Sequence, residues 1–148
     1  MRLVLQRVLE ASVELPGGER RGVGPGLLVL AGVGPRDDEA SAVRMAEKTA
    51  NLRIFSDERG KFDRSLLDVR GEALVISQFT LFGDCRRGRR PDFTGAMEPL
   101  RAEALYRAYA AALAGLGVAV KTGEFGAHMK VALVNDGPVT IWIDSDQA

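Results

Sequence analysis

Three polar residues follow a short apolar run in the middle of the chain. Ser77, Gln78 and Thr80, with Phe79 between them, come directly after residues 74–76. Backbone N–H groups run out of ladder partners where a strand ends, so they could act with the hydroxyls and the amide to hold a developing oxyanion. By local pattern alone, the commoner explanation is a strand end whose Ser and Thr satisfy turn hydrogen bonds. Residues 77–80 are therefore a candidate catalytic segment with a structural alternative.

A second candidate is the dipeptide Gly137-Pro138, which follows Asn135-Asp136 between two strand-like runs. A plain hairpin turn is the commoner explanation for such residues. An X-Pro bond can also be cis, as about 5% are in folded proteins. A cis Gly-Pro would aim two carbonyl oxygens in one direction, and the sequence leaves both possibilities open.

A dense basic patch stands in a Gly- and Pro-bearing segment, and it consists of Arg86, Arg87, Arg89 and Arg90. The planar guanidinium group bonds two phosphate oxygens at once. The chain as a whole is neutral, with 20 basic and 20 acidic residues, which argues against a general nucleic-acid coat. The patch is the natural candidate for contact with an RNA backbone, and a solvated charged loop is the alternative.

The chain has one histidine, His128, and one cysteine, Cys85. These counts exclude a site of several histidines, an internal disulfide and a thiolate zinc cluster. A Ser-His-Asp or Cys-His site would have to use His128, which the pattern indicates is a surface residue in a turn. We expect no metal and no cofactor.

Hydrophobic patterning predicts the elements that must position these residues. Strands are predicted at 3–8, 11–15, 20–23, 27–33, 52–55, 73–79, 118–122, 129–135 and 139–144, and helices at 37–51 and 99–116. Asp37 or Asp38 would cap the first helix, and Pro99 would begin the second. No linker or repeat divides the chain. We therefore predict a single α/β domain over residues 1–148, with two main helices and a mixed, largely antiparallel sheet.

The chain shows no membrane or export signal. No apolar run approaches the ~20 residues that a membrane span needs, and the alternating start with two early arginines is unlike a signal peptide. We expect a soluble, cytoplasmic protein with no membrane contact.

Taken in order, these segments resemble the D-aminoacyl-tRNA deacylase family along nearly the full length of the chain. The matching segments are residues 1–2, 6–8, 11–13, 24–30, 51–55, 65–69, 77–81, 88–91, 125–127 with 129, and 135–140. Residues 77–81 and 135–140 are similar to the two signature motifs of the family. Phe82-Gly83 and Cys85 depart from the family pattern, which bears on the detail of the following loop.

The resemblance implies a D-aminoacyl-tRNA deacylase fold and hydrolysis of the ester that joins a D-amino acid, or mischarged glycine, to the 3′-terminal adenosine of tRNA. It also implies a homodimer with active sites at the subunit interface. Gly137 and Pro138, joined by a cis bond, would reach into the partner's pocket and exclude the side chain of an L-amino acid. A rigid backbone wall rejects the wrong enantiomer without any contact that favours the right one.

The resemblance also assigns roles to single residues. Ser77, Gln78, Phe79 and Thr80 would line the pocket, with main-chain N–H groups near Phe79 holding the carbonyl oxygen. Thr80 would be the nucleophile, or the 2′-hydroxyl of the tRNA would assist an attacking water. The presence of a single histidine favours the second mechanism, because a threonine hydroxyl needs an activating base.

Further residues would support the pocket. Arg7 would brace the loop of Gly137 and Pro138, and the border of the adenosine or of the dimer contact would comprise Phe125, Gly126, Ala127 and Met129. Two rival functions stay open: a non-catalytic tRNA-binding module using residues 86–90, and a hydrolase of small esters or amides using His128 as a base.

Overall fold

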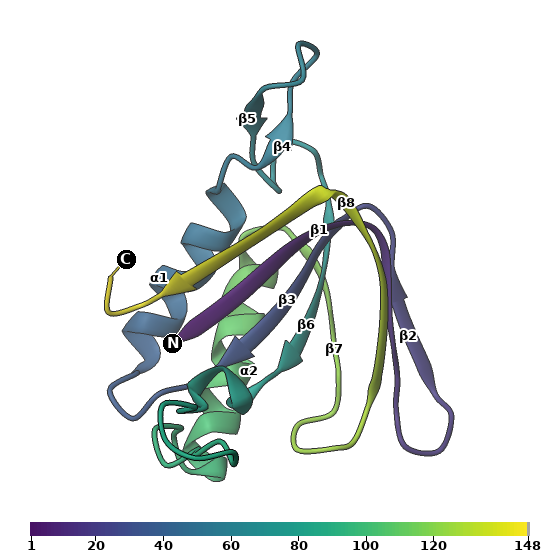
Figure 1. The fold of residues 1–148 in the computed structure, drawn as a ribbon. Coiled ribbons are helices and arrows are strands. Elements are labelled where there is room, and N and C mark those ends of the chain that lie inside the picture. Colours follow the sequence, from purple (N-terminus) through teal and green to yellow (C-terminus); the bar gives the residue numbers. More distant parts are fainter. Residues whose placement is uncertain (148) are drawn as a thin grey trace.

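Two long strands lie side by side and run the length of the sheet, with one of them at its edge (Figure 1). The computed structural model describes residues 1–147. β1 (Arg2–Glu14) pairs antiparallel with β8 (Lys130–Asp144) along its whole length. The other edge of β1 is shared, because β3 (Gly26–Gly32) pairs with its first half and β2 (Arg20–Val23) with its second half.

Two further strands extend the sheet in parallel from β3. β6 (Glu72–Ser77) pairs with β3, and β7 (Ala119–Thr122) pairs with β6. The short strands β4 (Phe55–Ser56) and β5 (Phe62–Arg64) form a separate hairpin that projects from one end of the molecule (Figure 1). The predicted mixed, largely antiparallel sheet is confirmed.

Two helices cover one face of this sheet. α1 (Glu39–Asn51) and α2 (Pro99–Gly115) pack on each other and share one hydrophobic core with β1, β3 and β6. Leu27 and Val29 of β3 face this core, whereas Leu28 belongs to a second cluster on the opposite face. Burial on both faces explains the continuous apolar run of β3. None of the helices in residues 1–147 has the length and apolar content that crossing a bilayer requires.

Two predicted strand breaks were wrong. The strands predicted at 3–8 and 11–15 are one strand, and so are those predicted at 129–135 and 139–144. The register of the β1–β8 pair shifts twice, between Gln6 and Glu10. Residues 136–139 of β8 stand opposite Arg7 alone, and Leu9 is an extra residue on β1. Such irregularities interrupt the in-out alternation without ending the strand. The interrupted pattern was therefore misread as a turn, and residues 135–138 lie within β8 rather than in a hairpin loop.

Two other predicted boundaries need correction. Residues 52–54 are the exit of α1 rather than a strand, with Leu52 as the C-cap. β6 ends at Ser77, and residues 79–82 form a single turn of 3-10 helix, η1 (Phe79–Phe82). The apolar residues after Ser77 belong to this turn. The alternation of apolar and polar residues that identifies strands does not show where a strand changes into such a turn.

The predicted helix starts are confirmed. Asp38 is the N-cap of α1: its carboxylate accepts from the Ser41 N–H at 2.8 Å, and the Ser41 hydroxyl accepts from the Asp38 N–H at 2.9 Å. Asp37 is buried instead and accepts from the Gly34 N–H at 2.6 Å. Pro99 begins α2, where its missing N–H has no intrahelical partner to lose.

Both tyrosines of the chain lie on the buried face of α2. The Tyr106 hydroxyl donates to the Val75 carbonyl at 2.7 Å, and the Tyr109 hydroxyl pairs with that of Thr49 at 2.8 Å. Burial raises the pKa of Tyr106 to about 12 and also raises the pKa of Tyr109. The hydroxyls therefore tie α2 to β6 and to α1 in their protonated form.

These shifts predict the alkaline behaviour of the protein. The chain has only two tyrosines, so near-ultraviolet absorbance of tyrosinate reports on them alone. We expect no tyrosinate in the folded protein at pH 10, whereas both ionise near pH 10 in urea. The folded state holds the protons more tightly, so this stabilisation is complete below pH ~10 and falls by about 1.4 kcal/mol per pH unit per tyrosine above it. Ionisation near pH 10 with native circular dichroism would contradict the buried hydroxyls.

Candidate functional site

A cavity of about 550 Å³ lies at the carboxyl end of β6, and two segments from distant parts of the sequence meet in it. Residues 77–79 line one side, and residues 125–129, from the connection between β7 and β8, line another. The start of α2 and the segment before it complete the wall with Phe93, Ala96, Met97, Pro99 and Ala102. The volume is in the range of small-molecule sites.

The structure brings together most of the sequence-predicted pocket residues. Those that line the cavity are Ser77, Gln78, Phe79, Phe125, Gly126, Ala127 and Met129. Thr80 is exposed one residue beyond the lining, and neither Arg7 nor the pair Gly137 and Pro138 contributes to it.

The turn η1 is set against the end of β3 by close backbone packing. The Gln78 N–H donates to the Ala31 carbonyl at 2.8 Å, which is the last bond before the chain leaves the sheet. Gly32 makes room for the turn, since a Cβ there would lie 2.8 Å from the Gln78 carbonyl oxygen. The Arg2 guanidinium donates to the Leu81 carbonyl at 3.0 Å and fixes the far end of the turn.

The turn η1 begins with two N–H groups that form no hydrogen bond within residues 1–147. Within residues 1–147, the N–H groups of Phe79 and Thr80 donate to no backbone or side-chain oxygen. The first N–H groups of any helix lack intrahelical partners. Two adjacent free donors beside a cavity can hold a carbonyl oxygen that gains negative charge.

The Thr80 hydroxyl has no base beside it. It accepts a hydrogen bond from the side-chain amide of Gln78, and in the described part of the chain no carboxylate or imidazole shares it. An amide cannot take the hydroxyl proton, so this geometry lacks an activated threonine nucleophile. His128 is exposed, as predicted, but it lines the cavity from the segment 125–129, which the sequence pattern did not indicate.

The segment 123–129 is folded onto the sheet and α2. The Gly123 N–H donates to the Val75 carbonyl at 3.2 Å, and the Ala127 N–H donates to the Glu124 carbonyl at 3.3 Å. The Phe125 ring packs against the Tyr106 ring with centroids 5.9 Å apart. The apolar side of the cavity is thus attached to the helix layer.

The arginine patch sits on a short loop closed by a two-residue bridge. Asp84 and Asp92 exchange backbone hydrogen bonds of 2.7 and 2.9 Å at its base. Arg86 folds back on the Asp84 carboxylate, with a contact of 2.6 Å from its Nη2, and its side-chain and backbone hydrogen bonds lower the pKa of Asp84 to about 2. The other three arginines are exposed and form no ion pair within residues 1–147: Arg87, Arg89 and Arg90. Three of the four predicted phosphate partners are therefore available.

Phe93 is a site residue that the sequence reasoning missed. Its ring meets the Phe79 ring edge to face, with centroids 5.1 Å apart and an interplanar angle of 72°. Both rings line the cavity and are substantially exposed. The available signal was an aromatic residue three positions after the last arginine of the run, in a loop that is otherwise mostly polar.

Gly137 and Pro138 lie at the opposite end of the sheet from the cavity. Their segment of β8 runs beside residues 6–8 of β1, which pair with the start of β3, whereas Ser77 lies at the end of β6 (Figure 1). The Gly137–Pro138 peptide bond is cis, and both residues are exposed. This end of the sheet therefore presents the dipeptide outward.

Arg7 anchors the segment that precedes this dipeptide. Its buried guanidinium donates to the Ile54 carbonyl at 2.8 Å and to the Asp136 carbonyl at 3.2 Å, and it pairs with the Asp136 carboxylate at 3.0 Å. One planar group thus joins three acceptors from two parts of the chain.

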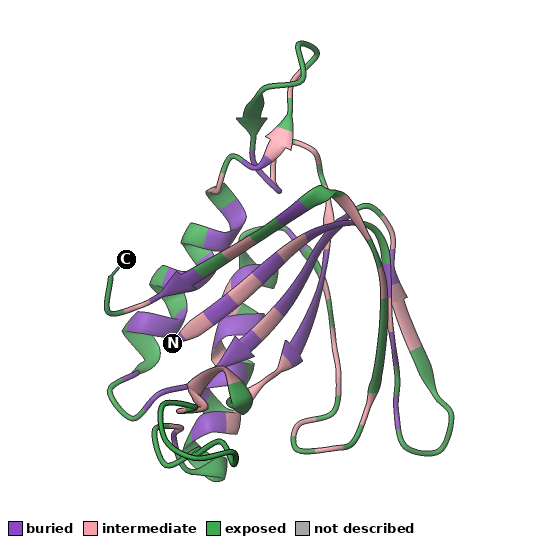
Figure 2. Cartoon of the chain, viewed as in Figure 1, coloured by how far each residue is buried: buried purple, intermediate pink, exposed green. Residues whose placement is uncertain are grey.

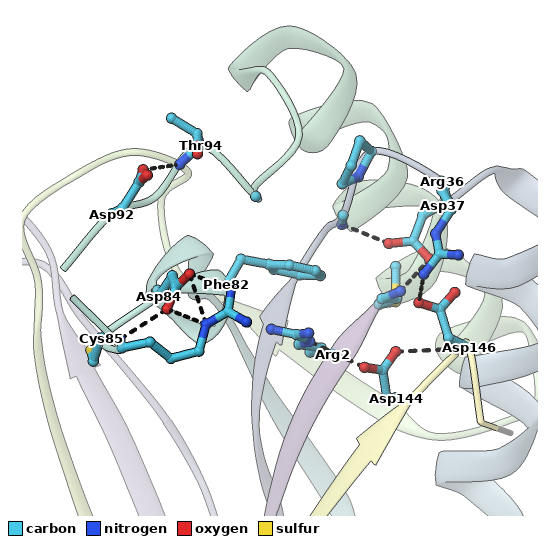
Figure 3. Close-up of a pocket in the computed structure, with 16 residues that line it drawn as sticks. Arg2, Arg36, Asp37, Phe82, Asp84, Cys85, Asp92, Thr94, Asp144 and Asp146 are labelled. Carbon is cyan, nitrogen blue, oxygen red and sulfur yellow. Dashed lines mark hydrogen bonds and ion pairs between the residues drawn. The ribbon is translucent and has the colours of Figure 1, made fainter.

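A larger cavity, of about 900 Å³, is lined by charged groups that neutralise one another. Figure 3 shows Arg2 paired with Asp144, at 3.1 Å between Nε and Oδ2, and Arg36 directed at Asp146. Of the predicted site residues only Arg86 lines it, already bound to Asp84. The smaller cavity joins free donors to an apolar wall, so we assign it as the candidate site.

Comparison with known proteins identifies the family. The family model described as D-Tyr-tRNA(Tyr) deacylase matches residues 4–144. The chain belongs to this family. The match covers the strand end, the arginine loop and both signature segments, so the resemblance seen in the sequence is confirmed.

Relatives in the deacylase family match over nearly their full length. The D-aminoacyl-tRNA deacylase of Roseiflexus castenholzii is 60% identical over 145 residues, which cover 98% of this chain and 92% of the relative. The enzyme of the same name from Thermomicrobium roseum is 59% identical over 145 residues, with 98% and 94% covered.

Solved structures match the deacylase fold. One, named "c-Myc DNA Unwinding Element Binding Protein", is 40% identical, with a TM-score of 0.89 over 97% of this chain and 98% of that one. Another, described as a probable eukaryotic D-amino acid tRNA deacylase, is 17% identical with a TM-score of 0.85, covering 96% and 97%. At that identity the second likeness shows the fold alone. The predicted fold class, a mixed α/β domain with two main helices, is confirmed.

Proposed function

We propose that this chain hydrolyses the ester between a D-amino acid, or glycine, and the 3′-terminal adenosine of tRNA, and that it does so without a cofactor. The observation that carries the proposal is the meeting of residues 77–79 and 125–129 around one cavity, in a chain that belongs to the deacylase family. The relatives that match over nearly the whole chain bear this activity in their names. The enzyme would act in the cytoplasm as one domain spanning residues 1–148.

The free N–H groups of Phe79 and Thr80 provide the electrostatic part of the reaction. Water adds to the ester carbonyl, and the carbonyl oxygen takes up negative charge that these two donors stabilise. The carbon–oxygen bond to the ribose then breaks, and the 3′-oxygen leaves with a proton. The adenosine lies against the apolar wall formed by Phe125, Ala127 and Met129.

The proton of the attacking water goes to the RNA rather than to the protein. Thr80 has only the Gln78 amide beside its hydroxyl, and an amide is no base. The ribose 2′-hydroxyl is adjacent to the ester in every aminoacyl-tRNA with a 3′-linked amino acid. It can relay the proton, and Gln78 and Thr80 then serve to hold the substrate.

Selection against L-amino acids requires a second copy of the chain. Gly137 and Pro138 are exposed at the end of the sheet opposite the cavity, so they can close only a cavity in another subunit. β8 is an edge strand that pairs with β1 alone among the described residues, and exposed stretches run along it (Figure 2). Its exposed apolar side chains include Val134 and Trp142. An exposed edge with apolar side chains suits pairing with a second chain. We infer a homodimer in which the dipeptide forms a wall against the L side chain, while glycine passes.

The decisive experiment compares D- and L-aminoacyl-tRNA as substrates of the purified protein. We expect hydrolysis of D-tyrosyl-tRNA and glycyl-tRNA, and none of L-tyrosyl-tRNA above the spontaneous rate. His128→Ala should keep hydrolysis of the D substrate within about threefold, because the mechanism uses no imidazole. Loss of all activity in this variant would instead favour a conventional hydrolase with His128 as base.

The group that assists the attacking water can be identified by removing the Thr80 hydroxyl from the protein and the 2′-hydroxyl from the tRNA. Thr80→Ala should retain activity within about tenfold, whereas a tRNA ending in 2′-deoxyadenosine should lose about 10²- to 10⁴-fold in kcat, the usual contribution of proton-transfer catalysis. Single-turnover rates with both substrates measure this. Abolished hydrolysis in Thr80→Ala, combined with full hydrolysis of the deoxy substrate, would make Thr80 the nucleophile.

Arg7 offers a test of the chiral wall. Arg7→Lys keeps the charge, but an ammonium group cannot bond the Ile54 carbonyl together with the Asp136 carbonyl and carboxylate in one plane. We expect kcat/KM for L-tyrosyl-tRNA to rise about tenfold or more, with a smaller change for the D substrate. The matched control is Arg64→Lys, because Arg64 is exposed and paired only with Glu58 at 3.5 Å. Undiminished rejection of the L substrate in Arg7→Lys would refute the bracing role.

A second candidate is a nucleic-acid-binding protein without catalytic activity. It is favoured by the three unpaired arginines of the loop, and by the 40%-identical solved structure, whose name refers to DNA binding. This alternative predicts tRNA binding that weakens steeply with salt and no faster loss of the D-amino acid than in buffer. The D- and L-substrate experiment separates the two.

A further inference from the structure

Two phenylalanine rings that line the cavity are exposed and in contact with each other. Phe79 is 58% exposed and Phe93 is 36% exposed, although their rings contact each other edge to face. The edge-to-face contact leaves ring faces uncovered. Large apolar groups that remain exposed in one cluster mark an interaction site more often than single exposed residues do.

The pair is held in place rather than free to move. Phe79 belongs to η1, which is packed on Gly32 and bonded by Arg2. Phe93 directly follows the bridge residue Asp92, and Gly83 lies so close that a Cβ there would be 3.0 Å from the Phe93 ring. Both rings are therefore preplaced, and little conformational freedom would be lost when a ligand stacks on them.

The same bridge carries the arginine loop. Asp84 and Asp92 close the loop at its base, so Arg87, Arg89 and Arg90 are attached next to the aromatic pair. These three arginines are exposed and without ion pairs in residues 1–147, in a chain whose net charge is zero. Exposed aromatic rings beside unpaired arginines are the combination that binds single-stranded nucleic acid, through base stacking and phosphate contact.

We propose that Phe79 and Phe93 form a stacking platform for one of the two cytidines that precede the terminal adenosine of tRNA, and that the arginine loop holds the phosphates of these unpaired nucleotides. The proposal rests on the proposed function, which puts the terminal adenosine inside the cavity. The preceding nucleotides must then leave past the exposed part of its lining, which includes Phe79 and Phe93. The arginine loop lies outside this lining and adjoins it at Asp92, the residue before Phe93. Because all tRNAs end in the same CCA sequence, such a platform would serve every tRNA alike.

The platform can be tested without catalysis by a double-mutant cycle, in which a protein ring and an RNA base are removed singly and together and the binding affinities are compared. The probe is a labelled RNA minihelix with an unpaired ACCA end, made intact or with an abasic ribose at either cytidine or at the terminal adenosine, and binding is measured by fluorescence anisotropy. Phe93→Leu keeps an apolar side chain but removes the ring face. Removing either the base or the ring should weaken binding by about 5- to 100-fold, as for one base-aromatic stack. Removing both should cost little more than removing one.

Two variants serve as controls for this cycle. Phe93→Trp keeps a ring face and should bind the intact minihelix about as tightly as the unaltered protein. Phe62→Leu removes a ring that is 53% exposed on β5, outside the cavity lining, and should leave binding unchanged. The salt dependence should be unaltered in Phe93→Leu and shallower in Arg89→Gln, since only the arginine contacts a phosphate.

Three results would overturn the platform. Additive losses from the abasic ribose and Phe93→Leu would show that the ring and the cytidine do not touch. If the loss from Phe93→Leu is non-additive only with removal of the adenine base, the rings contact the terminal adenosine rather than a cytidine. Dissociation of a dimer by Phe93→Leu, without coupling to the RNA, would show that a second copy of the chain covers the rings. Non-additive losses from Phe93→Leu and from a cytidine base, in a protein that hydrolyses no D-aminoacyl-tRNA, would refute the proposed function but support the platform.

Discussion

The antiparallel pairing of β1 with β8 is the interaction on which the rest of the structure depends. These strands span the molecule and form backbone hydrogen bonds between the first and last parts of the chain. β3 and β2 both add to the free edge of β1, and β6 and β7 add to β3. The position of Ser77 at one end of the sheet, and of Gly137 at the other, is thus fixed by the register of this pair.

The regular alternation of β1 explains how Arg7 comes to be buried, because it follows Leu3 and Leu5 on the face covered by the helices. The register shift after Gln6 places residues 136–139 of β8 opposite Arg7, which brings Asp136 within reach of its guanidinium. A buried guanidinium is tolerated only when its donors are satisfied, and Arg7 bonds the Ile54 carbonyl, the Asp136 carbonyl and the Asp136 carboxylate. The bulge, the buried charge and the exposed Gly137 and Pro138 form one local unit.

The sequence predicted those parts of the fold that depend on local chemistry. The buried strands around residues 27–33 and 73–77, the cap at Asp38 and the start of α2 at Pro99 follow from side-chain type and short-range spacing. The continuity of β1 and of β8 could not be predicted in this way. A bulge is stabilised by the partner strand, and single-sequence patterning contains no information about the partner.

Some residues of the candidate site could likewise be predicted from the sequence, whereas others have a role that depends on contacts between distant parts of the chain. Local pattern made residues 77–80 a catalytic candidate, and resemblance to a family added Phe125, Gly126, Ala127 and Met129. Nothing in their spacing brings the two segments together, because their meeting depends on the parallel placement of β7 on β6. Phe93 was missed because its role comes from contact with Phe79, 14 positions earlier in the sequence. The position of His128 on the cavity wall likewise follows from the path of the chain after β7.

The distance between the cavity and the outward-facing Gly137 and Pro138 has a consequence for fidelity. In the proposed dimer a single subunit holds the means to cleave the ester but not the means to choose the substrate. Discrimination would then be a property of the assembly, and dilution to monomers would leave an enzyme that is less selective without any change in its covalent structure. Selection for accuracy in such a protein acts on the subunit interface as strongly as on the pocket.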